Sequence, residues 1–179
     1  MKIKALFILS FVALILTSSA LGQERSYTNR KLGVSFRYPS DFRVKVDDGA
    51  EPTDFTITIS PRHPQKNSNG DYHFAISKSA LETNSAGTSE DSAKPPKGLP
   101  KTKLISGVRF KVFADSDAGA GQYYYSYGYR GWVKKSEWTI KYEEHTSPKE
   151  NFEPKVHELN TSRGRGILSR LAKSVRVLK

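Results

Sequence analysis

Apolar and polar residues alternate with a period of two over much of the first half of the chain. Residues 33–39, 42–46, 55–60 and 72–76 each have this alternation, and segments rich in Pro, Gly, Asp and Ser separate them. A period of two is typical of a β-strand with one buried face. The pattern therefore predicts four short strands in this half of the chain.

The second half predicts longer strands. Residues 104–113 are rich in β-branched and aromatic side chains, 122–133 contain five tyrosines and a tryptophan, and 137–143 alternate again. The cluster at 115–119 (DSDAG) has the composition of a turn, and Lys134-Lys135 forms a short link. These features predict an antiparallel meander.

Helical spacing is found only near the C-terminus. Phe152, Val156 and Leu159 fall on one face of a helix predicted within 151–162, Gly164 and Gly166 interrupt it, and a second helical stretch is expected over 167–172. Residues 175–178 predict an edge strand.

Residues 79–103 contain Ser, Asn, Gly and three prolines, with almost no apolar side chains. This composition predicts a mobile loop. A loop of this length is either a lid-like binding element or a tolerated insertion, and its composition favours the insertion.

The first 22 residues have the features of a secretory signal peptide. Lys2 and Lys4 precede a 12-residue apolar run at 5–16, and Ala20 and Gly22 are small residues at a cleavage site before Gln23. The run is too short for a typical membrane-spanning helix. We expect a secreted or periplasmic protein with no stable membrane anchor after cleavage, folded as a single domain over 23–179.

Cysteine is absent from the sequence, which excludes disulfides, thiolate metal sites and a thiol nucleophile. The net charge of +11 becomes +9 once Lys2 and Lys4 are removed with the leader. This charge favours anionic partners in the cell envelope or outside the cell, although it also serves solubility. Nucleic acid is a poor candidate partner for an exported chain.

Three segments resemble the PsbP-like family, which includes extrinsic subunits of photosystem II. Residues 27–42 (YTNRKLGVSFRYPSDF) are similar to the opening of these proteins, and 106–110 (SGVRF) with the closing residues 167–177 are similar to their end. The resemblance implies an α+β fold, an α/β/α sandwich with an antiparallel sheet of about six to seven strands flanked by helices. It also implies a protein without catalytic activity, and it assigns no residue a role.

The tyrosine-rich strand is the sharpest local feature. Tyr123, Tyr125, Tyr127 and Tyr129 should share one face, which aromatic side chains usually pack into a core. Residues on the opposite face and at the end of the strand could instead contact a ligand or partner. The candidates for this surface are Tyr124, Arg130 and Trp132.

Motifs for cofactors and metals are not found. The four histidines, His63, His73, His145 and His157, lack zinc-ligand spacing, and residues 115–119 fit a turn better than a calcium loop. No nucleophile elbow or phosphate-binding loop occurs in the sequence. We therefore expect no cofactor and no metal.

Three functions follow from these observations. The first is a non-enzymatic binding or assembly protein with an envelope or extracellular partner. The second is a small envelope hydrolase that uses Glu143 or Glu144 with Asp115 or Asp117 as a carboxylate pair. The third is polyanion or anionic-lipid binding, because the chain after Glu158 has six basic residues and no acid. The candidate anion-binding residues are Arg163, Arg165, Arg170 and Lys173.

Overall fold

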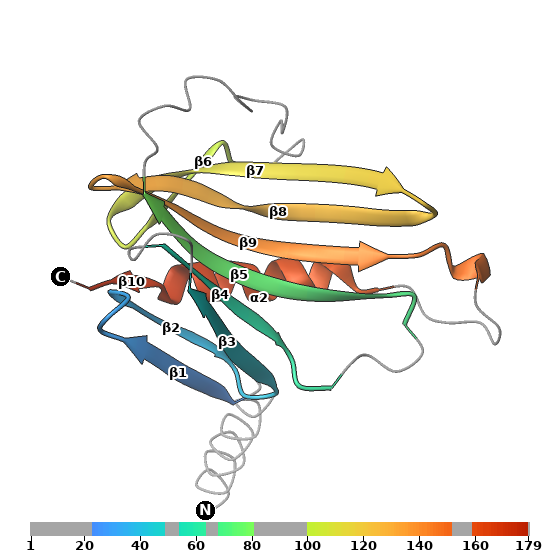
Figure 1. Cartoon of the computed structure of the whole chain (residues 1–179), viewed down its shortest axis with the longest axis horizontal. Coiled ribbons are helices and arrows are strands. Elements are labelled where there is room, and N and C mark those ends of the chain that lie inside the picture. The colour runs from blue at the N-terminus through green and yellow to red at the C-terminus, as the bar shows by residue number, and fades with distance from the viewer. Residues whose placement is uncertain (1–22, 49–53, 64–67, 81–99, 152–158, 179) are drawn as a thin grey trace, which may run out of the picture.

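A computed structural model describes residues 23–48, 54–63, 68–80, 100–151 and 159–178 (Figure 1). The predicted leader at 1–22, residues 81–99 of the predicted loop, and most of the helix predicted within 151–162 lie outside the described residues. The two ends of the 79–103 range belong to strands, since Ser79 and Ala80 end one strand and Thr102 begins the next.

Most of the described chain forms one antiparallel sheet of seven strands. The longest strands are neighbours in its middle, so that residues far apart in sequence meet on one surface (Figure 1). In spatial order the strands are β3 (Phe42–Asp48), β4 (Phe55–Pro61), β5 (Gly70–Ala80), β9 (Ser136–Thr146), β8 (Gln122–Val133), β7 (Val108–Gly119) and β6 (Thr102–Ile105).

A second, three-stranded sheet has the order β1-β2-β10. Its strands are β1 (Glu24–Asn29), β2 (Val34–Pro39) and β10 (Arg176–Val177), and both pairings are antiparallel. The chain passes from the small sheet to the large one at Ser40-Asp41, between β2 and β3. The edge strand predicted at 175–178 is confirmed as β10.

The large sheet has one apolar and one polar face. We call the face that carries Tyr127, Tyr129, Ile140 and Tyr142 the inner face, and these four side chains are buried. Helix α2 (Thr161–Ser174) packs on it, and its buried residues join the same core cluster. The opposite side is the outer face, and in Figure 1 it is turned toward the viewer with α2 behind the sheet.

The expected fold class, an α+β sandwich with helices flanking the sheet, is wrong. The described chain is mainly antiparallel β-structure, with ten strands in two sheets, one α-helix and the short 3-10 helix η2 (Lys149–Asn151). The small sheet takes part in covering the core, since Val34 and Phe36 are buried in the same cluster as the helix. Packing by β2 and one helix therefore replaces the helical layers that were expected.

Helix α2 runs without interruption through Gly164 and Gly166, where a break was predicted. Asn160 begins it, because its side-chain oxygen accepts a hydrogen bond from the Arg163 backbone N–H at 3.0 Å. Gly164 lies against the Tyr142 ring, and a Cβ at this position would be 2.5 Å from Tyr142 Cε2. The glycine is therefore a packing requirement of the helix and not its end.

The turn predicted at 115–119 is also misplaced. Those residues belong to β7, and the turn is formed by Ala120 and Gly121, whose φ values of 51° and 73° fit a two-residue hairpin. Another turn, at Ser106-Gly107, divides the expected strand 104–113 into β6 and β7.

Within the described part of the chain, no helix has the length and apolar character needed to cross a membrane.

Candidate functional site

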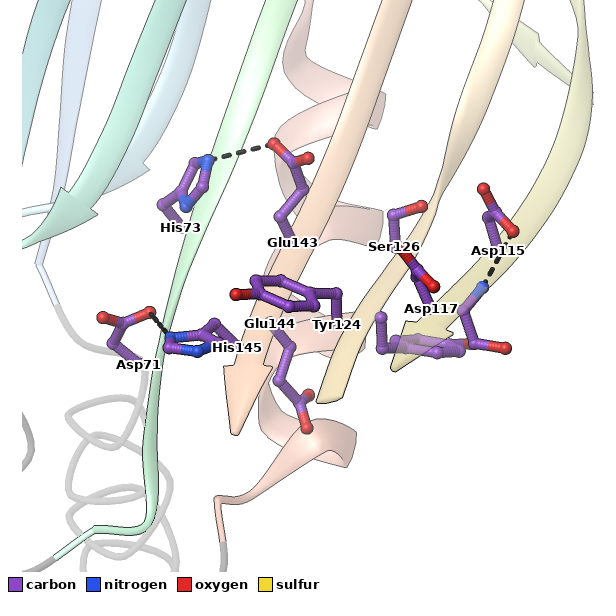
Figure 2. A pocket seen from close by; sticks show the side chains of 11 residues that line it. Asp71, His73, Asp115, Asp117, Tyr124, Ser126, Glu143, Glu144 and His145 are labelled. Carbon is purple, nitrogen blue, oxygen red and sulfur yellow. Dashed lines mark hydrogen bonds and ion pairs between the residues drawn. The ribbon is translucent and has the colours of Figure 1, made fainter. Parts of the chain in front are cut away.

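Two neighbouring rows of polar side chains cross the outer face of the large sheet (Figure 2). One row consists of Asp115, Ser126, Glu143 and His73, and the other of Asp117, Tyr124, His145 and Asp71, each residue paired with the next across β7, β8, β9 and β5. These eight residues line a hollow of about 400 Å³. We call it the outer-face hollow.

The positions of the acids and histidines follow from strand geometry. Asp71 and His73 are two residues apart on β5, and Glu143 and His145 are two residues apart on β9, so each pair points to one side of the sheet. Antiparallel pairing then sets His73 opposite Glu143, and Asp71 opposite His145. Each histidine thereby faces the acid of the other strand.

Glu143 is held as a carboxylate by two basic neighbours. Its Oε2 lies 3.0 Å from His73 Nε2, and its Oε1 accepts a hydrogen bond from Lys141 Nζ at 2.9 Å. The hydrogen bond from His73 is the main cause that lowers the pKa of Glu143 to about 2, with Lys141 adding to it and partial burial opposing it. Glu143 is therefore ionised across the physiological pH range.

His145 has a different environment. Its ring stacks on Tyr124 with 4.8 Å between ring centroids and 17° between planes. Its Nδ1 lies 4.0 Å from Asp71 Oδ1, and its Nε2 is buried without a hydrogen-bond partner among the described residues. Tyr124 is 48% exposed, so the stack presents one aromatic ring to solvent beside two carboxylates, Asp71 and Asp117.

A second hollow of about 420 Å³ adjoins the first and shares Asp71 and His73 with it. Its distinguishing residues are two arginines, Arg43 and Arg62. Arg43 Nε donates to Ser60 Oγ at 3.2 Å, and Arg62 Nε donates to the Phe42 carbonyl at 3.1 Å. The outer face thus changes from acidic near β7 and β8 to basic near β3 and β4.

The predicted division of the tyrosine strand between two faces holds only in part, because Tyr123, expected on the packed face, is 54% exposed. Tyr127 and Tyr129 are buried on the inner face, whereas Tyr124, Arg130 and Trp132 share the outer face of β8. Tyr124 lines the outer-face hollow and Trp132, 46% exposed, lies near the other end of the strand. The structure therefore places these three predicted residues on one surface but does not bring them into one site.

Between them, Arg130 lies over the Phe113 ring, 5.3 Å from its centroid. Its Nε is 3.4 Å from Glu137 Oε1. Arg130 is thus held by its neighbours and lies between the two exposed aromatic residues on the outer face of β8, Tyr124 and Trp132.

The four predicted anion-binding residues all lie on exposed positions of α2. Arg165 is partly engaged, because its Nη2 donates to the Tyr125 hydroxyl at 2.8 Å. Near the other end of the helix, Lys103 donates to Ser169 Oγ at 3.2 Å, and its pKa is lowered by burial and by Lys173. The helix thus forms a cationic surface on the side of the molecule opposite the outer-face hollow.

Of the acids considered for a hydrolase, Asp115, Asp117 and Glu143 point to the outer-face hollow, whereas the Glu144 carboxylate lies on the inner face. Asp115 and Asp117 each accept a hydrogen bond from the backbone N–H of the next residue, at 2.9 and 2.8 Å. Glu144 accepts from the Tyr142 hydroxyl at 2.6 Å and from Thr161 Oγ1 at 3.2 Å. Glu143, with a pKa of about 2, cannot donate a proton near neutral pH.

Sequence reasoning did not select Asp71, His73 or Ser126. The available signal was an acid and a histidine two residues apart, which occurs in both β5 and β9. Among the described residues, no group of three or more His, Cys, Asp or Glu side chains is arranged to hold a metal ion. The hollow presents carboxylates, two histidines and the aromatic ring of Tyr124.

Comparison with known proteins gives similarities of fold only. No protein-family model and no curated protein sequence matches the chain. A crystal structure from Bacteroides thetaiotaomicron is similar at 13% identity and a TM-score of 0.49, over 87% of this chain, which spans about half (48%) of that protein. The solution structure of cyanobacterial PsbP from Synechocystis is similar at 12% identity and a TM-score of 0.37, over 89% of this chain and 95% of that one.

Proposed function

We propose that this protein is an exported, non-enzymatic binding protein whose ligand site is the outer-face hollow. The observation that carries the proposal is the Tyr124–His145 stack at 4.8 Å, set among carboxylates on a sheet face that no described element covers. An exposed aromatic ring beside fixed carboxylates suits a ligand with a cationic group and a flat or apolar part.

Charge supports this choice of ligand. Four acidic side chains of the outer face, Asp71, Asp115, Asp117 and Glu143, line the hollow together with two histidines, and no lysine or arginine is among its lining residues. The chain as a whole carries a net charge of +11, so a cationic ligand is repelled by most of the molecule. If a cationic ligand binds at low salt, its binding must therefore come from this local acidic site. Amines and guanidinium groups are the classes that fit.

The proposal is tested by titrating the protein with a hexa-arginine peptide at low ionic strength, by calorimetry and by amide NMR shifts. Tyr124→Ala and Asp117→Asn should each weaken binding roughly fivefold, through loss of a cation–π contact or of one charge. Trp132→Ala, on the same strand face but outside the hollow, is the matched control and should bind as the wild type does. Equal losses in all three variants, or no binding to the wild type, would reject the site.

A second candidate function is polyanion binding by α2. The observation that favours it is the charge of the exposed helix surface, where Arg163, Arg165, Arg170 and Lys173 occur without any acid in the helix. The apolar residues of α2 are buried in the core, so contact with a partner would depend on charge. Salt-sensitive retention on heparin tests this function.

A further inference from the structure

Two large apolar side chains are exposed at one corner of the outer face, away from the hollow. Leu104, on edge strand β6, is 70% exposed, and Trp132, on β8, is 46% exposed. Leu104 pairs with Arg109 of β7, and two residues further along β7 Lys111 pairs with Arg130 of β8. Arg109 precedes Lys111 by two residues and Trp132 follows Arg130 by two residues, so both lie toward the same end of the sheet. Leu104, Arg109 and Trp132 are therefore close to one another on neighbouring strands. We call this region the Trp132 corner.

The corner is strongly basic. Arg109, Lys111, Lys134 and Lys135 are all exposed around the two apolar side chains. Residues 100–113 contain no acid, and in the stretch from 128 to 137 the one acid is Glu137, which lies 3.4 Å from Arg130. Arg109 pairs with Leu104, while Trp132 pairs with Glu137 on its β9 side. Exposed Trp and Leu side chains in a region rich in long basic side chains match the composition of protein surfaces that lie in a membrane interface.

Backbone turns fix the shape of this corner. The β6–β7 turn has φ values of 50° at Ser106 and 79° at Gly107, and the β8–β9 turn has 57° at Lys134. Both turns lie at the same end of the large sheet, where Figure 1 shows the β8–β9 turn at the left. Four hydrogen-bonded strands, β6 to β9, thus hold the corner.

We infer that the Trp132 corner docks the protein peripherally on an anionic membrane surface. Trp132 and Leu104 would enter the interfacial region of the lipid, and the four exposed cations would contact anionic headgroups. Charge complementarity favours lipid over an apolar protein partner, because each apolar side chain lies next to a basic residue and the edge strand is flanked by cations. This inference does not depend on the ligand proposed for the hollow.

Tryptophan fluorescence gives a direct test, because the chain has two tryptophans. Trp138 is buried and makes an edge contact with Phe55, at 5.6 Å between ring centroids, so it should not respond to lipid. The exported protein, with its N-terminus established by intact mass, is mixed with vesicles of phosphatidylcholine alone or with phosphatidylglycerol. We expect a blue shift and quenching by brominated lipid only with the anionic vesicles, and Trp132→Phe should abolish both.

Vesicle co-sedimentation measures affinity. Leu104→Ser with Trp132→Ser should weaken partitioning at least tenfold, and Lys134→Gln with Lys135→Gln should weaken it by a similar factor at low salt. Tyr124→Ala, which removes the exposed ring at the other end of β8, is the control and should not change it. Unchanged binding in the Leu104/Trp132 variant, or loss only when α2 cations are replaced, would overturn the inference. A further outcome would also overturn it: the protein dimerises, does not bind vesicles, and loses the dimer in Trp132→Ser. This outcome would assign the corner to a second copy of the chain.

Discussion

His73 and Glu143 face each other directly across strands β5 and β9, with 3.0 Å between Nε2 and Oε2. Two residues along the same ladder the order is reversed, and Asp71 of β5 faces His145 of β9. The outer-face hollow thus contains two histidine–carboxylate pairs related by the antiparallel register. The first is a close contact at 3.0 Å, whereas the second is longer, at 4.0 Å, and its histidine also stacks on Tyr124.

The first pair predicts how stability depends on pH. The pKa of Glu143 is lowered from 4.5 to about 2, so its stabilising effect is complete above about pH 5 and is lost as the pH falls toward 2. Because the side chains of Glu143 and His73 are 33% and 39% exposed, solvent screening reduces this effect to about 1 kcal/mol.

Urea unfolding between pH 7 and pH 2 should therefore give a smaller acid-dependent loss for Glu143→Gln than for the wild type. Glu137→Gln, which removes another ion-paired acid of the same face, should leave most of the loss in place. Identical pH profiles for the wild type and Glu143→Gln would contradict the role given to this pair.

The two glycines of α2 predict opposite effects of the same substitution. Gly164→Ala should destabilise the protein by roughly 1 to 3 kcal/mol, because the added methyl overlaps the Tyr142 ring. Gly166→Ala, where nothing lies within 4 Å of the new Cβ, should stabilise it by about 0.5 to 1 kcal/mol through helix propensity. Thermal or urea unfolding measures both. If the two variants shift stability in the same direction, the packing of α2 on β9 is not as described.

The cationic surface of α2 predicts salt-dependent binding to heparin. Replacing Arg163, Arg170 and Lys173 with Gln should weaken binding roughly tenfold at low salt and reduce the salt dependence. The control removes the same net charge from the small sheet and its turn, at Arg25, Arg30 and Lys31, which are also exposed. Equal effects of the two triple variants would indicate that net charge alone, and not the helix, determines retention.

The signal-peptide features of residues 1–22 predict that the chain is cleaved during export. The full-length gene expressed in a bacterium should yield protein in the periplasm or medium whose N-terminal residue is Gln23. Intact mass and N-terminal sequencing measure this. Replacing the apolar run at 5–16 with polar residues should keep the protein in the cytoplasm, and recovery of an uncleaved chain from wild-type cells would contradict the prediction.

Features of the fold that depend on neighbouring residues in the sequence could be predicted, whereas features that depend on contacts between distant residues could not. Alternation in 33–39, 42–46, 55–60 and 72–76 identified strands correctly, because burying one face of a strand imposes a period of two on its own sequence. The break predicted at Gly164 was wrong because helix propensity is local, whereas the reason for this glycine is the ring of Tyr142, 22 residues away in sequence.

The sequence by itself determined most of the strands, the two faces of β8 and the absence of any thiol, since each of these depends on residue type and local spacing. It did not predict β1 or the division between β6 and β7. The tertiary structure decided that the strands form two sheets with one described α-helix. It also decided that Asp71 and His73 lie beside His145 and Glu143, because register between strands 70 residues apart is set by the packing of the inner face. The candidate site is a consequence of that register.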